Sequence, residues 1–366
     1  MKTVHLAWRH PADDTRIFQR ECQSLGDHGF NVTYIVPSSE PSDLEHITVE
    51  PISSMNGQKY RRYINIIREF YKKSLYENAD IYHIHEPELI PIGVLLKKHG
   101  KKVIYDAHEH TFHHKWSAQI PLWQKIPETV AAVSFEKAAS LLFDGIVAAT
   151  PTIKGTFPDE KSVTVANFPR LETVNKIEHL PYGDRSNTIV YVGGITEIRG
   201  IKEMVQAMSL LPSHLDVRLQ IAGKFSTDDL KEEITTMEGW EKVDFHGWVS
   251  HDRVFELLGH SKAGLIPFHP TTNNANGLPN KLFEYMAAGL PVIASDFESW
   301  EEFIENPPCG RFVDPTDPYE IAEQIEWVFT NQDCAESMGE NARKMVESEY
   351  NWESQEEKLI KFYHDL

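Results

Sequence analysis

Short apolar runs alternate with amphipathic stretches along the whole chain, and this alternation is the feature that most constrains its fold. In the first half, strand-like runs with helical patterns between them occur at residues 4–7, 32–36, 81–85, 103–105 and 145–149. Alternation of this kind predicts a parallel sheet covered by helices. A second set begins with TIVYVGG at residue 188 and continues through VRLQIAG, VDFHG, AGLIPF and PVIAS. The sequence therefore predicts an α/β protein with two doubly wound sheets.

The two sets are separated by a polar segment without sustained periodicity. Residues 168–187 contain two prolines and a glycine, and we interpret them as an interdomain linker. This places a first domain at residues 1–167, a second at 188–349, and a final helix at 350–366. A chain of 366 residues is long enough for two domains with separate cores.

Charge and cysteine content exclude some classes of function. The net charge is −19, whereas broad nucleic-acid binding needs a basic surface. The three cysteines have no Cys-x-x-Cys spacing, which favours a reducing compartment. The first residues run directly into a strand-like VHLAW, and no apolar run reaches the roughly 18 residues of a membrane span. We expect a cytoplasmic protein with no nucleic-acid partner, at most peripheral to the inner face of the cell membrane.

The string NGLPNKLFEYMAAGLPVIAS, residues 276–295, carries the clearest local signals. Pro279 is placed as the first residue of a helix that Gly289 ends, and residues 292–294 form a buried strand. Lys281 lies in the first helical turn, where the helix dipole disfavours a cation unless an anion is nearby. Glu284 follows on an adjoining face, where its carboxylate can accept hydrogen bonds from sugar hydroxyls. For this pair alone, an ordinary surface Lys–Glu pair is the favoured interpretation.

The wider string changes this balance. FEYMAAGLPVIA resembles the donor-site motif of glycosyltransferase family 4, in which a Glu-x7-Glu element accompanies AMAxGxPVIA. The resemblance implies the GT-B fold, with two Rossmann-like domains facing a cleft and a C-terminal helix that returns to the first domain. It also implies retaining transfer from a nucleotide sugar without a metal or other cofactor. Glu284 matches the second glutamate, which holds the ribose, and Asn276 stands where the first is expected.

The turn VGGITEIRGI, residues 192–201, resembles the family string GRLxxxKG, whose arginine and lysine hold the diphosphate. Arg199 with Gly200 fits the lysine–glycine pair, but Gly194 occupies the place of the arginine. We expect Lys281 to supply the missing cation. The string FHGWV resembles the turn near the nucleotide base, where Trp248 either stacks on a base or packs on the protein. The donor-binding residues so implied are Gly193, Gly194, Arg199, Trp248, Val249, Asn276, Gly277, Leu278, Asn280, Lys281 and Glu284.

In the first domain, HIHEPEL and DAHEH both end strands, at the sheet edge where reactive groups collect. The resemblance places His108 beside the donor sugar as a catalytic residue, together with Arg199, Lys281 and Glu284. The acceptor-side candidates are His10, Asp14, Arg16, His85, Glu86 and Glu109. Among them Asp14 is better interpreted as a helix cap. We predict no metal, because an H-x-H pair on a strand does not fix a third ligand.

A basic amphipathic stretch at residues 59–73 stands out in this acidic chain, and aromatic residues gather at 112–123. These segments indicate either a membrane surface that presents a polyprenyl-diphosphate-linked or saccharide acceptor, or an ordinary surface helix. HPADDTRIFQRE and IYHIHEPEL also resemble bacterial relatives that build surface polysaccharides. The leading hypothesis is thus a retaining glycosyltransferase of cell-surface polysaccharide synthesis. A sugar-nucleotide epimerase of related fold and a non-catalytic partner subunit remain alternatives, the latter because of Asn276 and Gly194.

Overall fold

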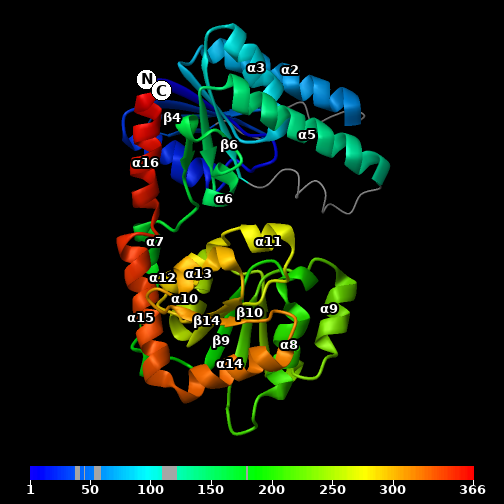
Figure 1. Cartoon of the computed structure of the whole chain (residues 1–366), viewed down its shortest axis with the longest axis vertical. Coiled ribbons are helices and arrows are strands. Elements are labelled where there is room, and N and C mark those ends of the chain that lie inside the picture. Colours follow the sequence, from blue (N-terminus) through cyan, green and yellow to red (C-terminus); the bar gives the residue numbers. More distant parts are fainter. Residues whose placement is uncertain (38–41, 45, 53–58, 109–121, 179) are drawn as a thin grey trace. The chain divides into compact units, whose positions relative to one another are not determined.

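A computed structural model of the protein describes all residues except 38–41, 45, 53–58, 109–121 and 179 (Figure 1). The chain divides into two compact units. The first comprises residues 1–167 and 352–366, and the second comprises residues 168–351. No helix in the described parts is both long and apolar enough to cross a membrane.

The first unit is built on an eight-stranded sheet with the order β3-β4-β2-β1-β5-β6-β7-β8. The strands are β1 (Lys2–Leu6), β2 (Asn31–Val36), β3 (Ser42–Leu44), β4 (Ile47–Pro51), β5 (Ile81–Ile84), β6 (Lys102–Ala107), β7 (Gly145–Ala148) and β8 (Ser162–Thr164). All neighbours are parallel except the edge strand β3, which is antiparallel to β4. The strand order reverses at β1, which pairs with β2 and with β5. Ligands of such sheets bind at this reversal, beyond the carboxyl ends of the strands.

Helices cover both faces of this sheet because alternate strand residues are apolar on both sides. They are η1 (Ile17–Cys22), α1 (Gln23–Asp27), α2 (Lys59–Glu77), η2 (Pro87–Leu89), α3 (Ile90–Lys98), α5 (Leu122–Leu142), α6 (Pro151–Lys154), η3 (Asp159–Lys161) and α16 (Trp352–Asp365). One core contains residues of α2, α3 and α5, and the other contains residues of η1, α1 and α16. Trp352 of α16 is buried and donates to Ser24 Oγ at 2.8 Å. The C-terminal helix therefore packs on the first unit, as expected.

The second unit contains a six-stranded parallel sheet with the order β11-β10-β9-β12-β13-β14. Its strands are β9 (Thr188–Val192), β10 (Arg218–Ala222), β11 (Val243–Gly247), β12 (Ala263–Ile266), β13 (Val292–Ser295) and β14 (Gly310–Val313). The strand order reverses at β9, between β10 and β12. The expectation of two doubly wound parallel sheets is thus confirmed.

Helices surround this second sheet and include part of the predicted linker. They are α7 (Leu171–Lys176), η4 (Tyr182–Asp184), η5 (Glu197–Arg199), α8 (Ile201–Leu210), α9 (Asp228–Thr235), η6 (Trp240–Lys242), α10 (His251–His260), α11 (Thr272–Asn276), α12 (Asn280–Ala287), η7 (Glu298–Trp300), α13 (Glu301–Ile304), α14 (Pro318–Thr330) and α15 (Gln332–Ser348). Residues 168–187 contain α7 and pack with the second unit. Buried Arg185 fixes this segment by donating to the carbonyl oxygens of Ser261 and Gly289 at 3.3 and 3.1 Å.

Candidate functional site

The turn that follows β9 brings backbone and cationic groups together at the reversal of the second sheet. Gly193 has a φ of +134°, a conformation that side-chain-bearing residues rarely adopt. The carbonyl oxygen of Gly194 accepts from the Tyr191 hydroxyl at 2.7 Å and from Arg199 Nη1 at 3.1 Å. Gly200, with a φ of +74°, lies against Pro267, where a Cβ would stand 2.1 Å from the carbonyl oxygen. Glycine is therefore required at both ends of this turn.

Helix α12 delivers Lys281 and Glu284 to the same place. Pro279 is the extended residue that precedes the helix rather than its first helical residue, which is Asn280. Gly289, with a φ of +65°, ends the helix as expected, and residues 292–294 lie in β13. The helix is fixed to β9 because the hydroxyl of buried Tyr285 accepts the N–H of Val192 at 2.8 Å.

Two cations meet beside Gly193. A Cβ on Gly193 would stand 3.0 Å from Lys281 Nζ and 3.6 Å from Arg199 Nη1, so both charges lie around one point. A Cβ on Gly194 would stand 2.9 Å from Arg199 Nη1. Because these two glycines have no side chains, the side chains of Lys281 and Arg199 can occupy the space beside them.

The surroundings of Lys281 make its charge costly. Nζ lies 4.8 Å from the ring centroid of buried Phe268 and 5.3 Å from that of buried Tyr191. Burial, followed by repulsion from Arg199, lowers the pKa of Lys281 to about 7. Within the described parts of the chain, no carboxylate forms an ion pair with Lys281 or Arg199. Two cations held together without an anion form a site for a ligand that carries negative charge.

Glu284 lies one turn further along α12 and is half-buried. In the part of the chain that the structure describes, its carboxylate forms no hydrogen bond and no ion pair within 4 Å. Its charge still acts on Lys281, whose pKa it raises against the stronger effects of burial and Arg199. A carboxylate without a partner beside an anion site is available to accept hydroxyl hydrogen bonds.

The residues that precede α12 are mainly engaged in shaping the chain. The Asn276 side chain donates to the carbonyl oxygen of Thr272 at 2.8 Å, within its own short helix α11. The carbonyl oxygen of Gly277 accepts from the indole N–H of Trp300 at 2.7 Å. Leu278 is half-buried and Asn280 is exposed.

Trp248 and Val249 follow β11, the edge strand, which β10 separates from β9. The Trp248 side chain is 72% exposed, and Lys224 Nζ lies 5.9 Å from its ring centroid. Val249 is half-buried. This tryptophan is therefore not a packing residue, and base stacking remains a prediction.

In the first unit, His108 lies just beyond β6 and is held by Asp106. His108 Nε2 is 2.9 Å from Asp106 Oδ2, and the carboxylate is completely buried. Burial alone would raise the pKa of Asp106, but the Arg16 guanidinium and then His108 hold it well below its usual range. The ionised carboxylate thus fixes the ring of His108, whose side chain is 19% exposed.

A second histidine–carboxylate pair lies beside the first. His10 Nδ1 is 2.9 Å from Asp14 Oδ2, and the ring centroids of His10 and His108 are 5.2 Å apart. Burial opposes the charge of His10, but the hydrogen bond with Asp14 raises its pKa. Asp14 also accepts the N–H groups of Arg16 and Ile17 at 2.9 and 2.8 Å, which agrees with the predicted cap. The pair therefore combines a structural cap with a partly exposed polar surface.

Two other acceptor-side candidates are used inside the protein, which corrects their predicted role. The guanidinium of Arg16 is buried and donates to Asp106 Oδ1 at 3.0 Å and to the Val165 carbonyl oxygen at 2.9 Å. The buried carboxylate of Glu86 accepts the N–H groups of Trp8 and Arg9 at 2.8–3.0 Å and so fixes the loop after β1. Glu109 lies outside the described residues.

His85 belongs to a buried polar network that sequence reasoning did not assemble. His85 Nδ1 is 3.3 Å from Asp106 Oδ2, and its Nε2 is 2.9 Å from His5 Nδ1. Tyr363 Oη of α16 lies 2.7 Å from His83 Nδ1 and 3.2 Å from His5 Nε2. The available signal was the alternation of histidines. His5 of β1 pairs with His83 of β5, and His85 follows two residues later, so the three can point to one face of the sheet.

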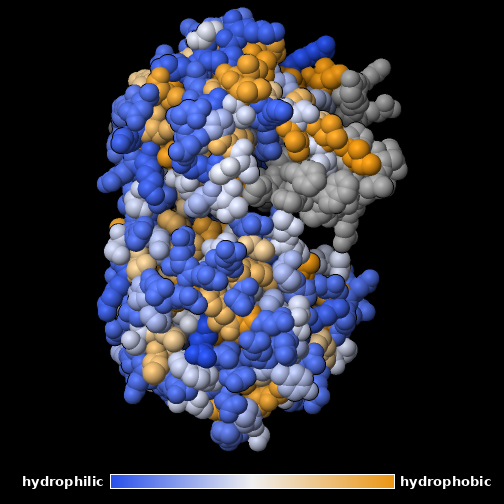
Figure 2. All heavy atoms as spheres, viewed as in Figure 1, coloured by the Kyte–Doolittle hydropathy of each residue, from blue (hydrophilic) through white to orange (hydrophobic). Residues whose placement is uncertain are grey.

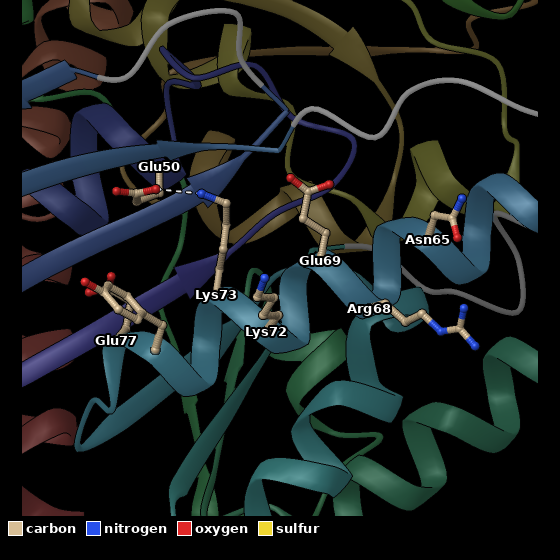
Figure 3. A pocket seen from close by; sticks show the side chains of 8 residues that line it. Glu50, Asn65, Arg68, Glu69, Lys72, Lys73 and Glu77 are labelled. Carbon is tan, nitrogen blue, oxygen red and sulfur yellow. Dashed lines mark hydrogen bonds and ion pairs between the residues drawn. The ribbon is translucent and has the colours of Figure 1, made fainter.

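The basic stretch at residues 59–73 forms most of α2, which packs on the sheet through buried Ile66 and Phe70. An open hollow of about 680 Å³ lies along this helix (Figure 3). Its cations are largely matched by acids, for example Lys73 Nζ, which lies 2.7 Å from Glu50 Oε2. This hollow therefore lacks the charge excess of a phosphate site. Residues 112–121 lie outside the described parts.

Two family models match consecutive parts of the chain. One, described as Glycosyltransferase Family 4, matches residues 15–163. The other, described as Glycosyl transferases group 1, matches residues 175–345.

Curated relatives carry related names. An uncharacterized glycosyltransferase of Methanocaldococcus jannaschii is 28% identical over 195 residues, which are 52% of this chain and 48% of the relative. The capsular polysaccharide biosynthesis glycosyltransferase CapM of Staphylococcus aureus is 23% identical over 252 residues, or 63% of either chain. The chain thus spans about half to two thirds of the length of these relatives.

Solved structures show the same fold at low identity. Sucrose-phosphate synthase from Thermosynechococcus elongatus has a TM-score of 0.77 and 16% identity, over 100% of this chain and 98% of that one. Anabaena HepE in complex with UDP-glucose has a TM-score of 0.76 and 14% identity, over 100% of both chains. The fold is therefore GT-B.

Proposed function

Because the chain belongs to glycosyltransferase family 4, we propose that it transfers a sugar from a nucleotide-sugar donor to an acceptor with retention of configuration. The observation that carries this proposal is the meeting of Lys281 and Arg199 around one point at the sheet reversal. Two cations there match the two charges of a nucleotide diphosphate. Glu284 next to them provides an acceptor for the ribose hydroxyls.

In this proposal the two cations act on the leaving group. As the bond between the anomeric carbon and the phosphate oxygen breaks, negative charge grows on the diphosphate. Lys281 and Arg199 then stabilise that charge more strongly than they stabilise the intact donor, which lowers the barrier. The acceptor's hydroxyl oxygen bonds to the anomeric carbon on the face from which the phosphate departs, and the leaving phosphate oxygen takes the hydroxyl proton, which gives retention. No side-chain nucleophile is required.

We assign His108 to the donor sugar. Its ring is fixed by the ionised carboxylate of Asp106 at 2.9 Å, so it is held in place rather than free to rotate. A fixed ring and its backbone can contact sugar hydroxyls and the reacting centre with little loss of entropy. The neighbouring His10–Asp14 pair is proposed to meet the acceptor.

The donor is proposed to be a UDP-sugar in the first instance. Anabaena HepE, which has the same fold, was solved with UDP-glucose, with UDP, and with UDP and glucose. We also propose that the transfer itself uses no metal, because Lys281 and Arg199 supply positive charge where a metal would otherwise neutralise the diphosphate. Donor hydrolysis should then be unchanged by brief exposure to a chelator.

We further propose that the acceptor is a saccharide or a polyprenyl-diphosphate-linked saccharide of cell-surface polysaccharide synthesis, met at a membrane surface. Helix α5 exposes apolar side chains at helical spacing, with Ile126 47%, Val130 60%, Val133 38% and Leu141 71% exposed (Figure 2). An apolar stripe on a surface helix is typical of interfacial binding. Co-sedimentation with anionic vesicles, lost in Val130→Glu, tests this contact.

Donor turnover tests the function. The purified chain is incubated with UDP-, GDP- and ADP-sugars, and the released sugar is followed by proton NMR. Slow release of the retained anomer, abolished in Lys281→Gln and kept in the exposed control Lys231→Gln, is the expected result. An isomerised sugar nucleotide would instead identify an epimerase. Binding of none of these donors would refute the proposal and favour a non-catalytic partner.

A further inference from the structure

Four buried side chains from three elements converge in the first unit, beneath the reversal of its sheet. They are His5 of β1, Glu21 of η1, His83 of β5, and His85 at the end of β5. One nitrogen or oxygen atom of each lies within 4.8 Å of those of the other three. All four are closed off from solvent, with at most 3% exposure. The cluster does not include the Lys281–Arg199 pair of the second unit, but His85 contacts Asp106, which holds His108.

The distances within the cluster are too long for a hydrogen-bonded carboxylate. Glu21 Oε2 lies 3.9 Å from His83 Nδ1 and 4.0 Å from His85 Nε2. A charged hydrogen bond would bring these atoms to about 2.7–2.9 Å. Ligands of one tetrahedral Zn²⁺, with bonds of about 2.0–2.1 Å, are instead separated by about 3.3 Å. Small movements of the side chains would thus bring them around one ion.

Some atoms of the cluster have no hydrogen-bond partner among the described residues. Both oxygens of Glu21 accept no hydrogen bond, and neither does His83 Nε2. Oε1 has an ion pair with Arg16 Nε at 3.1 Å, which leaves Oε2 facing the imidazoles. A buried polar atom without a partner costs about 1–3 kcal/mol. Glu21 Oε2 therefore points to a ligand inside the cluster. On His83 the nitrogen available to bind it is Nε2, because Nδ1 is 2.7 Å from Tyr363 Oη.

The outward-facing nitrogens, in contrast, are supported as metal-bound histidines usually are. His85 Nδ1 lies 3.3 Å from Asp106 Oδ2, and His5 Nε2 lies 3.2 Å from Tyr363 Oη. Such outer partners hold the proton on the outer nitrogen and leave the inner nitrogen free to bind. The inner atoms His5 Nδ1 and His85 Nε2 are 2.9 Å apart. A bound ion would replace their hydrogen bond.

The charges of the buried groups around the cluster also favour a bound cation. A metal-bound imidazole is neutral, so the three histidines would bring no charge to the site. One guanidinium, that of Arg16, faces the two buried carboxylates of Glu21 and Asp106. One negative charge thus remains to be balanced by a proton or a metal ion.

We propose that His5, Glu21, His83 and His85 bind one Zn²⁺ as a closed structural site. Three imidazole nitrogens and one carboxylate oxygen suit zinc, and four protein ligands leave no position open for catalysis. The ion fastens η1 to β1 and β5. The loop of His10 follows β1, and Asp106 of the neighbouring strand β6 lies 3.3 Å from His85 Nδ1. The sequence prediction of no metal did not include His5 or Glu21, which the fold brings beside His83 and His85.

Metal analysis of the whole chain tests this proposal. The protein is purified without a polyhistidine tag or chelator, and zinc is measured by mass spectrometry. About one zinc per chain is expected, with a loss of at least tenfold in Glu21→Gln and His83→Gln. The matched control is His28→Gln, because exposed His28 also lies near a glutamate, with Nδ1 3.3 Å from Glu356 Oε1. This control should retain the zinc.

Two further measurements keep the test decisive if a variant fails to fold. Chelator-treated wild-type protein is loaded with Co²⁺, and strong visible absorption of a tetrahedral site is expected. Zn²⁺ should also raise the melting temperature of the wild type but not of folded Glu21→Gln. Less than a tenth of an equivalent of zinc in the wild type, the weak spectrum of octahedral Co²⁺, or unchanged zinc in both variants would overturn the site. None of these outcomes depends on glycosyltransferase activity.

Discussion

Lys281 connects the donor site to a measurable pH dependence, because its charge depends on what lies beside it. In the free protein its ammonium group lies between two aromatic rings and near Arg199 Nη1. Burial and the like charge of Arg199 lower its pKa to about 7. A bound diphosphate would place negative charge beside this group and raise its pKa back toward the usual value of a lysine. Above neutral pH, donor binding must therefore be accompanied by uptake of a proton.

The size of the effect follows from the charged fraction of Lys281 in the free protein. With a pKa of about 7, this fraction is about nine-tenths at pH 6 and about 3% at pH 8.5. The diphosphate of a UDP-sugar is a diester and does not titrate in this range. The dissociation constant should therefore rise about 30-fold from pH 6 to pH 8.5, which corresponds to about 2 kcal/mol.

Isothermal titration calorimetry measures both the affinity and the proton. Titrations at pH 6, 7 and 8.5 are repeated in buffers that differ in ionisation enthalpy. Close to one proton should be taken up per donor at pH 8.5 and almost none at pH 6. In Lys281→Gln, binding should be weaker and independent of pH. In Arg199→Gln, the loss of affinity with pH should begin at a higher pH, because the like charge is removed.

Two results would refute this reasoning. A wild-type affinity that changes less than threefold over this range, without proton uptake, would show that Lys281 does not contact the diphosphate. A slope that persists in Lys281→Gln would assign the titration to a different group.

The remaining predictions concern stability and the roles of single side chains. Between pH 7 and about 10 the unfolded chain binds a proton on Lys281 that the native chain lacks, so the free energy of unfolding of the wild type should rise with pH. Lys281→Met removes this buried charge, and calorimetry at pH 7 should therefore find a higher melting temperature for the variant. Arg185→Ala should lower the free energy of unfolding in urea by about 2–4 kcal/mol, since several buried carbonyl oxygens lose their donor, and a loss below 1 kcal/mol would contradict this. Glu284→Gln should weaken donor binding about tenfold in calorimetry, and unchanged affinity would remove Glu284 from the ribose site. His108→Gln should lower donor turnover at least tenfold with the dissociation constant within threefold, whereas equal changes in both would indicate a binding role only.

Much of the fold was predictable because its signals are local. Alternating apolar runs and helical spacing predicted both parallel sheets, and Gly289 marked the end of α12 through its need for a positive φ. The placement of Lys281 in the first turn of α12 was also local, since a lysine there opposes the helix dipole. The predicted helix start was wrong by one residue, because Pro279 is extended and Asn280 begins the helix.

The candidate site was less predictable because a residue type does not reveal its burial. Arg16 and Glu86 carry charges that suit an acceptor, yet both are buried and engaged by protein groups. Asn276 matched the place of a sugar-binding glutamate but bonds within its own helix. For Arg16 and Glu86 the outcome depends on partners that are distant in sequence, such as Asp106 for Arg16.

By itself the sequence determined the alternation of the main strands and helices, though not the strands β3, β4, β8 and β14. It also determined the turns that require glycine and the charges on α12, because these depend on neighbouring residues. Only the tertiary structure decided which of these groups meet. The strand order at β9 brings Lys281 of α12 to Arg199 of η5, and the packing of α16 brings Tyr363 to the histidines of β1 and β5. Local periodicity specifies which face of a helix or strand is buried. Which residues of other elements contact that face depends on how all the elements pack into one core. The sequence alone therefore could not show that two cations share one point or that four ligand atoms share another.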